Sequence, residues 1–254
     1  MGLQQVQHLW AKLVTSSGYS SQTIELVGTL IVQILAFWIP SFIYISLDEL
    51  WPAVSRRHKL QSQQRQPSRR DIRQCFTLVM QNQLLATALH WMKVSATRKG
   101  ILPSSYRVEA AFPSGQEFAR DFVLSLLMRE AMFYYVHRLF HEVPWLYKKI
   151  HKRHHRFVAP VALAAQYAHP VEHIFANTLP ITLPPQILGS HILTFWAYLA
   201  FELFGTATVH SGYDFFAGKA RMHDLHHEKF NLNYGSIGLC DYLHGTNELK
   251  RKTL

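Results

Sequence analysis

The chain has 254 residues, a net charge of +10, 48% hydrophobic residues and only 17% charged residues. Soluble domains carry about a quarter charged residues, so this composition favours a membrane protein over a soluble one. The basic residues lie in loops between apolar segments and form no stripe with interleaved aromatics, which argues against nucleic-acid binding. The two cysteines, Cys75 and Cys240, exclude a disulfide framework and a C-x-x-C metal site.

Two apolar segments occupy the first part of the chain. The segment from Leu26 to Leu47 is uncharged over 22 residues, which is long enough to cross a membrane, and Pro40 is expected to kink it. The segment from Gln74 to Met92 contains Gln81-Asn82-Gln83, so it predicts a weaker span whose amides need buried partners. The connection from Trp51 to Arg73 holds seven Lys and Arg residues, so the positive-inside rule places it in the cytosol.

The third apolar segment, Phe118 to Val136, carries four charges at positions that would lie within a membrane. Each charge at that depth costs about 2.5–3.5 kcal/mol, so the four side chains must pair or face the protein interior. These residues are Arg120, Asp121, Arg129 and Glu130.

A longer apolar segment, Ile174 to Phe201, is interrupted by prolines and by Gly189. It predicts a helical hairpin that enters the membrane and returns through Ser190 to Val209. A hairpin crosses the membrane an even number of times, so it returns the chain to the cytosol. We therefore expect all the clustered histidines of the chain to lie on the cytosolic side.

These segments predict an all-α integral membrane bundle of about four crossings with a cytosolic helical cap that carries histidine motifs. Residues 1–117 form the N-terminal membrane region with two spans and the basic loop, 118–246 the catalytic region, and 247–254 a basic tail. Lys250 and Lys252 resemble a cytosolic dilysine signal for retrieval to the endoplasmic reticulum.

Histidines repeat at a spacing that is typical of metal ligands. The pattern H-x-x-H-H occurs twice, although a random chain of this composition would contain it about 0.06 times. Positions i, i+3 and i+4 share one helical face, so we expect each copy to present three imidazoles to a single point. A further pair of histidines stands at positions i and i+4, the spacing by which one face of a helix offers two ligands to a metal. The eight histidines exceed the ligands of one ion and indicate two metals. They are His137 and His141, then His151, His154 and His155, then His223, His226 and His227.

The motifs HRLFH, HKRHH and HDLHH at these positions resemble the three histidine boxes of the fatty acid hydroxylase/sterol desaturase superfamily. The resemblance runs from Phe118 to Thr246. The stretches AHPVE (168–172), HSGYD (210–214) and DYLHGT (241–246) are similar to its sterol C-4 methyl oxidase and sterol hydroxylase branches. It implies a non-haem di-iron centre at the cytosolic face of the endoplasmic reticulum membrane.

The resemblance implies that the eight box histidines are the iron ligands and that His210 is a ninth. Thr206 stands where relatives often have His or Asn, which leaves one metal with a different set of ligands or a water. His169 and His173 are candidates for a metal ligand, a hydrogen-bond partner of a ligand or a substrate contact. His90, His191 and His244 are expected to be structural.

Nearby carboxylates are expected to orient the imidazoles of the box histidines by hydrogen bonding to their second ring nitrogen. The candidates are Glu130, Glu142, Glu172, Glu202, Asp214, Asp224 and Asp241.

The resemblance implies an enzyme that activates O2 to hydroxylate or desaturate an unactivated C–H bond of a lipid such as a sterol, fatty acyl chain or terpenoid. The chain contains no haem domain and no Gly-rich nucleotide motif, so electrons are expected from NAD(P)H through a reductase and cytochrome b5. The alternative is a histidine-rich membrane protein that binds or transports metal without redox turnover. That alternative predicts histidines spread through the bilayer.

Overall fold

The computed structural model describes residues 2–62, 65–216 and 218–247, and within this part of the chain it contains helices and no β-strand. Two isolated bridges join Lys59 to Tyr213 and Arg107 to His191. The helices are α1 (Leu3–Ser16), α2 (Ser21–Gln33), η1 (Ile34–Trp38), α3 (Ile39–Leu50), α4 (Pro52–His58), α5 (Arg69–Arg98), α6 (Gly115–Glu142), α7 (Pro144–Lys149), η3 (His151–Arg156), η4 (Ala162–Gln166), α8 (Pro170–Glu172), η5 (His173–Thr178), α9 (Leu179–Ile187), α10 (Ile192–Val209), α11 (Lys219–Lys229) and α12 (Leu239–His244).

Within the described residues, two helices are long and apolar enough to cross a membrane, judged by length and composition. They are Ser21–Leu50, which combines α2, η1 and α3, and Ile192–Val209, which is α10. The irregularity expected at Pro40 takes the form of the π-helical turn η1 directly before it. Proline lacks the N–H that would bond to the preceding turn, and a π turn accommodates that loss within a continuous helix.

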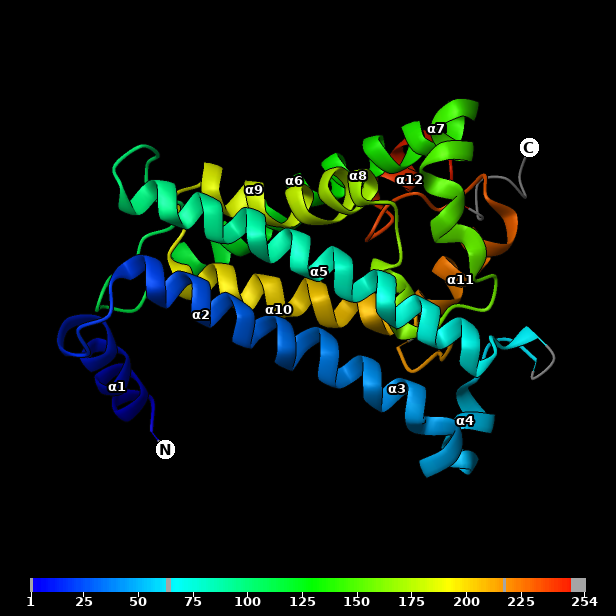
Figure 1. Ribbon diagram of the computed structural model, residues 1–254, viewed down its shortest axis with the longest axis horizontal. Coiled ribbons are helices and arrows are strands. Elements are labelled where there is room, and N and C mark those ends of the chain that lie inside the picture. The colour runs from blue at the N-terminus through cyan, green and yellow to red at the C-terminus, as the bar shows by residue number, and fades with distance from the viewer. Residues whose placement is uncertain (1, 63–64, 217, 248–254) are drawn as a thin grey trace.

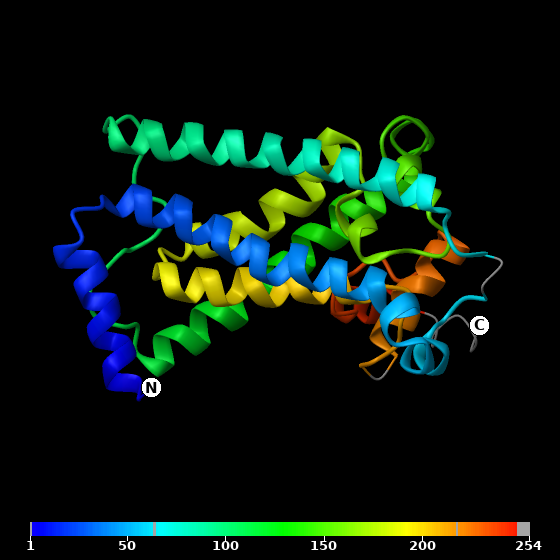
Figure 2. The same cartoon turned by 60° about the horizontal axis from the view of Figure 1, so that its bottom comes forward.

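The long helices lie alongside one another and place the histidine motifs at one end of the molecule (Figures 1 and 2). Helix α10 packs against α2 and η1, and α6 packs against α9. The short helices α4, α7, α11 and α12 gather at the end opposite α1 (Figure 1). The core between the long helices includes Phe37, Val79, Ile192 and Phe195, each at most 1% exposed.

The polar residues within the apolar segments find buried partners, as the sequence predicted. Asn82 of α5 donates to the carbonyls of Gln166 and Ala168 at 3.1 and 3.0 Å. Gln83 donates to the Gln166 side chain.

The charged residues of α6 pair or face the interior. Arg129 forms a buried ion pair with Glu202 of α10 at 2.8 Å, and Arg120 pairs with the buried Asp121. Glu130 is fully buried and accepts hydrogen bonds from backbone nitrogens of a loop described below. The four charged residues of α6 therefore pair or face the protein interior, as the sequence predicted.

The predicted hairpin is present as α9 and α10, although α9 begins at Leu179, after the π turn η5. The connection turns at Gly189, whose φ of +61° lies in the left-handed region that favours glycine. His191 caps α10 by accepting from the Leu193 N–H at 3.1 Å. His191 therefore has the structural role expected of it.

Candidate metal centre

The C-terminal end of α6 and two short helices carry the histidine boxes. Helix α6 presents His137 and His141 one turn apart before it ends at Glu142. The second box lies on the 3-10 helix η3, and the third lies on α11, which begins after Gly218 at φ +83°. His210 follows the last residue of α10. Four segments that are distant in the sequence thus bring imidazoles to one end of the bundle.

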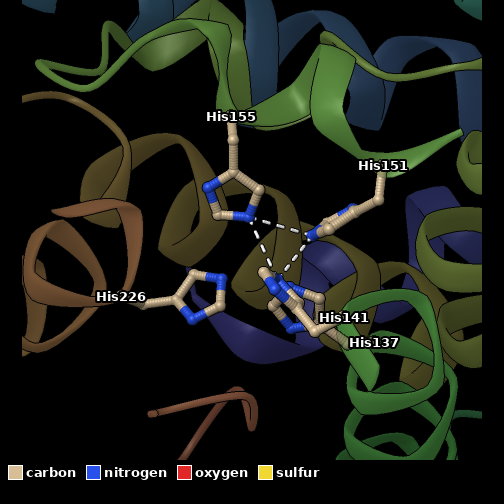
Figure 3. A group of neighbouring side chains, drawn as sticks. All are labelled: His137, His141, His151, His155 and His226. Atoms are coloured by element: carbon tan, nitrogen blue, oxygen red, sulfur yellow. Dashed lines mark hydrogen bonds between the residues drawn. The ribbon is translucent and has the colours of Figure 1, made fainter. Parts of the chain in front are cut away.

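Five histidines form the first cluster, with one ring nitrogen from each within 4.8 Å of all the others. Figure 3 shows their rings turned toward a common centre from α6, η3 and α11. Nε2 of His151 lies 2.7 Å from Nε2 of His141 and 2.9 Å from Nε2 of His155. The members are His137, His141, His151, His155 and His226.

Four histidines form the second cluster under the same distance limit, namely His154, His210, His223 and His227. Nε2 of His223 lies 2.8 Å from Nε2 of His210 and 3.1 Å from Nε2 of His227. His154 completes the group at 3.5 Å from His210. All nine histidines predicted as ligands therefore fall into two adjacent groups.

The expectation that each H-x-x-H-H motif faces a single point is wrong. His151 and His155 belong to the first cluster, but His154 belongs to the second. On α11 the middle histidine is again separated, because His226 joins the first cluster while its neighbours join the second. On an α-helix, residues i+3 and i+4 differ by about 100° around the axis, so two metal positions can divide them.

Backbone carbonyls determine the proton position on three of the rings. Nδ1 of His137 donates to the Tyr234 carbonyl at 2.7 Å, and Nδ1 of His226 donates to the Leu232 carbonyl at 2.7 Å. Nδ1 of His210 donates to the Thr206 carbonyl at 2.9 Å. A carbonyl only accepts, so each neutral ring keeps a bare lone pair on Nε2.

The bare nitrogens fit a cation. Nε2 of both His137 and His226 is buried and has no hydrogen-bond partner among the described residues. Buried lone pairs that face one another without a proton are unfavourable unless a metal accepts them. Neutral imidazole suits iron, zinc, copper and nickel, so the donor set fits transition metals and allows iron.

Burial keeps these rings neutral. It lowers the pKa of His154 and of His226 to about 4, and that of His210 to about 3. The pKa values of His223 and His227 are lowered well below the usual range, first by burial and then by neighbouring rings. Neutral imidazoles can bind metal without first losing a proton.

Glu172 is the carboxylate that orients a box histidine. Its Oε1 accepts from Nδ1 of His151 at 2.7 Å, and burial raises the pKa of Glu172 well above its usual range. The other predicted carboxylates contact no clustered ring among the described residues. Glu142 pairs with Arg138, Glu202 with Arg129, Asp214 with the Gly218 N–H, and Asp224 with Gln61.

Glu130 and Asp241 act on the clusters through a loop. Asp241 accepts from the N–H groups of Tyr234 and Gly235 at 2.8 and 2.7 Å. Glu130 accepts from the Ser236 N–H at 2.7 Å. The two carboxylates hold the loop whose carbonyls orient His137 and His226. Sequence analysis missed these carbonyls, because a backbone acceptor has no signature in residue type.

His169 and His173 lie outside both clusters. His169 caps α8 by accepting from the Val171 N–H at 3.2 Å. His173 is buried at the start of η5. Thr206 contributes its backbone carbonyl to His210, and the second cluster has one imidazole fewer than the first. His244 stacks on Tyr134, and His90 pairs with Glu25, as structural histidines do.

Two adjoining cavities reach the clusters. The smaller, about 50 Å³, is lined by histidines of both groups. The larger, about 260 Å³, has an apolar wall that includes Phe201, Val209 and Met222. Five residues line both cavities, namely Arg129, Phe133, Thr206, His210 and His223. An apolar molecule in the larger cavity can therefore approach the second cluster.

The helical fold, its two long apolar helices and its paired polyhistidine groups define a class of histidine-box proteins. Comparison with known proteins gives the family. The family model described as "Fatty acid hydroxylase" matches residues 122–246. The human "Fatty acid hydroxylase domain-containing protein 2" is 30% identical over 97% of this chain and 74% of that protein. The chain belongs to the fatty acid hydroxylase family, which confirms the resemblance.

Other relatives differ in the reaction that their names describe. "Methylsterol monooxygenase 1-2" of Arabidopsis thaliana is 36% identical over 54% of this chain and 49% of that protein. "Very-long-chain aldehyde decarbonylase GL1-10" of rice, Oryza sativa subsp. japonica, is 35% identical over the same shares. No solved structure matches the chain. The names of these two relatives describe a methylsterol monooxygenase and an aldehyde decarbonylase.

Proposed function

We propose that the chain is a membrane-bound non-haem di-iron oxygenase that uses O2 to hydroxylate or desaturate an unactivated C–H bond of a lipid. The observation that carries this proposal is the convergence of nine imidazoles on two adjacent points. Three of the rings have their proton held on the outer nitrogen by a backbone carbonyl. Substrate classes that suit the partly apolar larger cavity are sterols, fatty acyl chains and terpenoids.

The first cluster would hold one iron and the second cluster the other. Bound iron supplies the redox chemistry that reduces O2 and removes hydrogen from an unactivated C–H bond. The chain itself orients the rings through Glu172 and the carbonyls of Leu232, Tyr234 and Thr206. Phe133 and Met222 line the larger cavity and limit the access of water. The threonine side chain at position 206 cannot replace an imidazole, so the second cluster would hold its metal with four histidines.

The same proposal places the protein in the endoplasmic reticulum membrane, multi-pass, with about four crossings and a cytosolic cap. The predicted cytosolic loop contacts the histidine-box region at several places. Gln61 donates to Asp224 at 2.6 Å, and Arg156 donates to Asp71 at 2.8 Å. These contacts support a cytosolic position of both clusters, because the positive-inside rule predicts that the loop is cytosolic. The dilysine signal at Lys250 and Lys252 lies outside the described residues.

An acidic electron donor such as cytochrome b5, supplied from NAD(P)H by a reductase, suits the surface near the first cluster. Lys148, Lys149, Lys152 and Arg153 are exposed on α7 and η3, next to the second histidine box. Complementary charge speeds the encounter of redox partners and orients them. The grouping of the histidines at one end of the bundle also supports an oxygenase over a metal transporter.

The test is the metal content of detergent-purified protein, together with O2 uptake after reduction with dithionite. The native chain should hold two irons, and His154→Ala should lose the second iron and its activity. His244→Ala is the matched control, because His244 lies outside both clusters. One zinc or a variable metal content, without O2 uptake for any lipid class, would instead favour the metal-binding or transport alternative.

A further inference from the structure

A buried ion pair between α6 and α10 lies on the wall of the larger cavity. Arg129 of α6 is 7% exposed and Glu202 of α10 is 5% exposed, with Nε of Arg129 2.8 Å from the Glu202 carboxylate. Both residues line the larger cavity, and Arg129 also lines the smaller one. A charged pair in this position borders the space that substrate would occupy.

The pair has hydrogen-bonding capacity that the described part of the chain does not use. A guanidinium has five N–H donors, and Nε of Arg129 is buried without a hydrogen-bond partner among the described residues, although it forms the ion pair with Glu202. The Glu202 carboxylate likewise has no other donor within the residues described. Buried donors and acceptors are normally satisfied, and both residues border the cavity, so a polar ligand there can supply the missing hydrogen-bond partner.

The charge of the pair restricts the ligand. Glu202 already compensates the charge of Arg129, and the buried carboxylate of Glu130 follows Arg129 in the chain. A ligand carboxylate would therefore bring an uncompensated buried charge, which is costly. A ketone could accept from Arg129 but would leave Glu202 without a donor. A hydroxyl both donates and accepts, so it complements the two members of the pair.

The distance along α6 and α10 between the ion pair and the histidines indicates which part of a bound lipid would lie near the clusters. Arg129 precedes His137 on α6, and Glu202 precedes His210 at the end of α10, by the same number of residues. At 1.5 Å per residue, the separation along either helix is ~12 Å. A hydroxyl bound at the pair would therefore keep its own end of the lipid near the second cluster.

We infer that the Arg129–Glu202 pair recognises a hydroxyl group of the substrate and directs oxidation to the hydroxyl-bearing end of the lipid. This inference rests on the proposed oxygenase function and names its substrate class, a lipid alcohol. The pair is a specificity determinant and takes no part in the chemistry. The hydroxyl can belong to a ring system, as in a sterol, or to a long-chain alcohol.

The test measures the preference for a hydroxyl in full-length protein in detergent. A radiolabelled methylsterol is displaced by unlabelled methylsterol, by its deoxy analogue, by hexadecan-1-ol and by hexadecane. In the native chain at least one alcohol should displace the label about tenfold better than its deoxy partner, as expected for hydrogen bonds to charged groups. A preference for methylsterol over its deoxy analogue would identify a sterol hydroxyl, and a preference for hexadecan-1-ol over hexadecane would identify a long-chain alcohol.

The variant Arg129→Met with Glu202→Leu removes the ion pair without leaving either charge unpaired, and such replacements usually preserve folding. In this double variant, the alcohol should displace the label about as well as its deoxy partner, so the ratio of the two affinities falls to about one. The iron content should stay native. Arg129→Lys, which keeps the charge but not the fork of donors, should retain an intermediate preference. Arg69→Met with Glu49→Leu, which removes an exposed pair of the same chemistry, should behave as the native chain.

Three results would overturn the inference. They are a native preference of about one for both alcohols, an unchanged preference in the Arg129 and Glu202 variant, and a methylsterol product oxidised in its side-chain tail. The iron content and O2 uptake of the native chain test the proposed function separately, because the binding preference can also be measured in metal-free protein.

Discussion

The rings of His154 and His227 lie 4.8 Å apart between centroids, although the two residues belong to different histidine boxes. His155, the next residue, lies beside both His226 and His227, at 4.9 and 4.7 Å, but it belongs to the first cluster together with His226. Each H-x-x-H-H motif thus contributes to both clusters. The second and third boxes are therefore interdependent, since a displacement of η3 or α11 alters both proposed iron sites.

Because each motif contributes histidines to both clusters, single substitutions within one motif should affect different clusters. His226→Ala should reduce metal binding mainly at the first cluster, and His223→Ala, on the same helix, mainly at the second. We expect each variant to retain about one of two irons, because the other cluster keeps its own histidines. Mössbauer spectra of protein enriched in ⁵⁷Fe would distinguish the remaining sites. Identical residual spectra for both variants would contradict the division of α11 between clusters.

Removal of the Glu172 carboxylate should weaken the first cluster. Glu172→Gln replaces the acceptor that holds the His151 proton, and losses of this kind typically lower metal affinity by about 10- to 100-fold. Competition with a chelator would measure the change. Glu142→Gln is the control, because Glu142 is exposed and pairs with Arg138 in the next turn. Equal affinities for the native chain and Glu172→Gln would refute the orienting role.

The loop that carries the Leu232 and Tyr234 carbonyls has no room for a side chain at Gly235. A Cβ there would lie 2.5 Å from Glu130 Oε1 and 2.8 Å from Asp241 Oδ2. Gly235→Ala should therefore displace both buried carboxylates and lower stability by about 2–4 kcal/mol, with loss of metal. Gly205→Ala is the control, since its Cβ would meet nothing within 4 Å. Thermal melting and metal analysis would compare them.

Acid should destabilise the metal-free protein. Burial holds the pKa of His154 and of His226 at about 4, below the ordinary value of 6.5 for histidine, so the unfolded chain binds more protons between these values. The stability contributed by the neutral rings is complete above pH 6.5 and is lost as the pH falls toward 4. Thermal melts of chelator-treated protein between pH 7.5 and 4.5 would measure this loss.

His154→Asn provides the check on this pH effect. The variant should show a smaller dependence of stability on pH, by about one proton, because one depressed histidine is removed. A slope unchanged from that of the native chain would show that His154 is not responsible. Iron should also leave the native chain as the pH falls, since protons compete with metal for imidazole.

The sequence by itself determined the helical class, the apolar segments and all nine histidines that form the clusters. The helical class, the apolar segments and the eight box histidines follow from local patterns, which hold in any packing of the helices, whereas His210 was identified only through the family resemblance. It also predicted that Arg129, Glu130 and Asn82 would need buried partners, because an unpaired polar group in an apolar environment is costly.

Only the tertiary structure decided how the histidines divide between the two clusters. The directions of His154 and His226 depend on the 3-10 geometry of η3 and on where α11 lies against α6 and α10, and neither follows from the spacing. The carbonyls of Leu232 and Tyr234 orient rings solely because Glu130 and Asp241 hold their loop. The pairing of Arg129 with Glu202 likewise joins two helices whose contact no local pattern specifies.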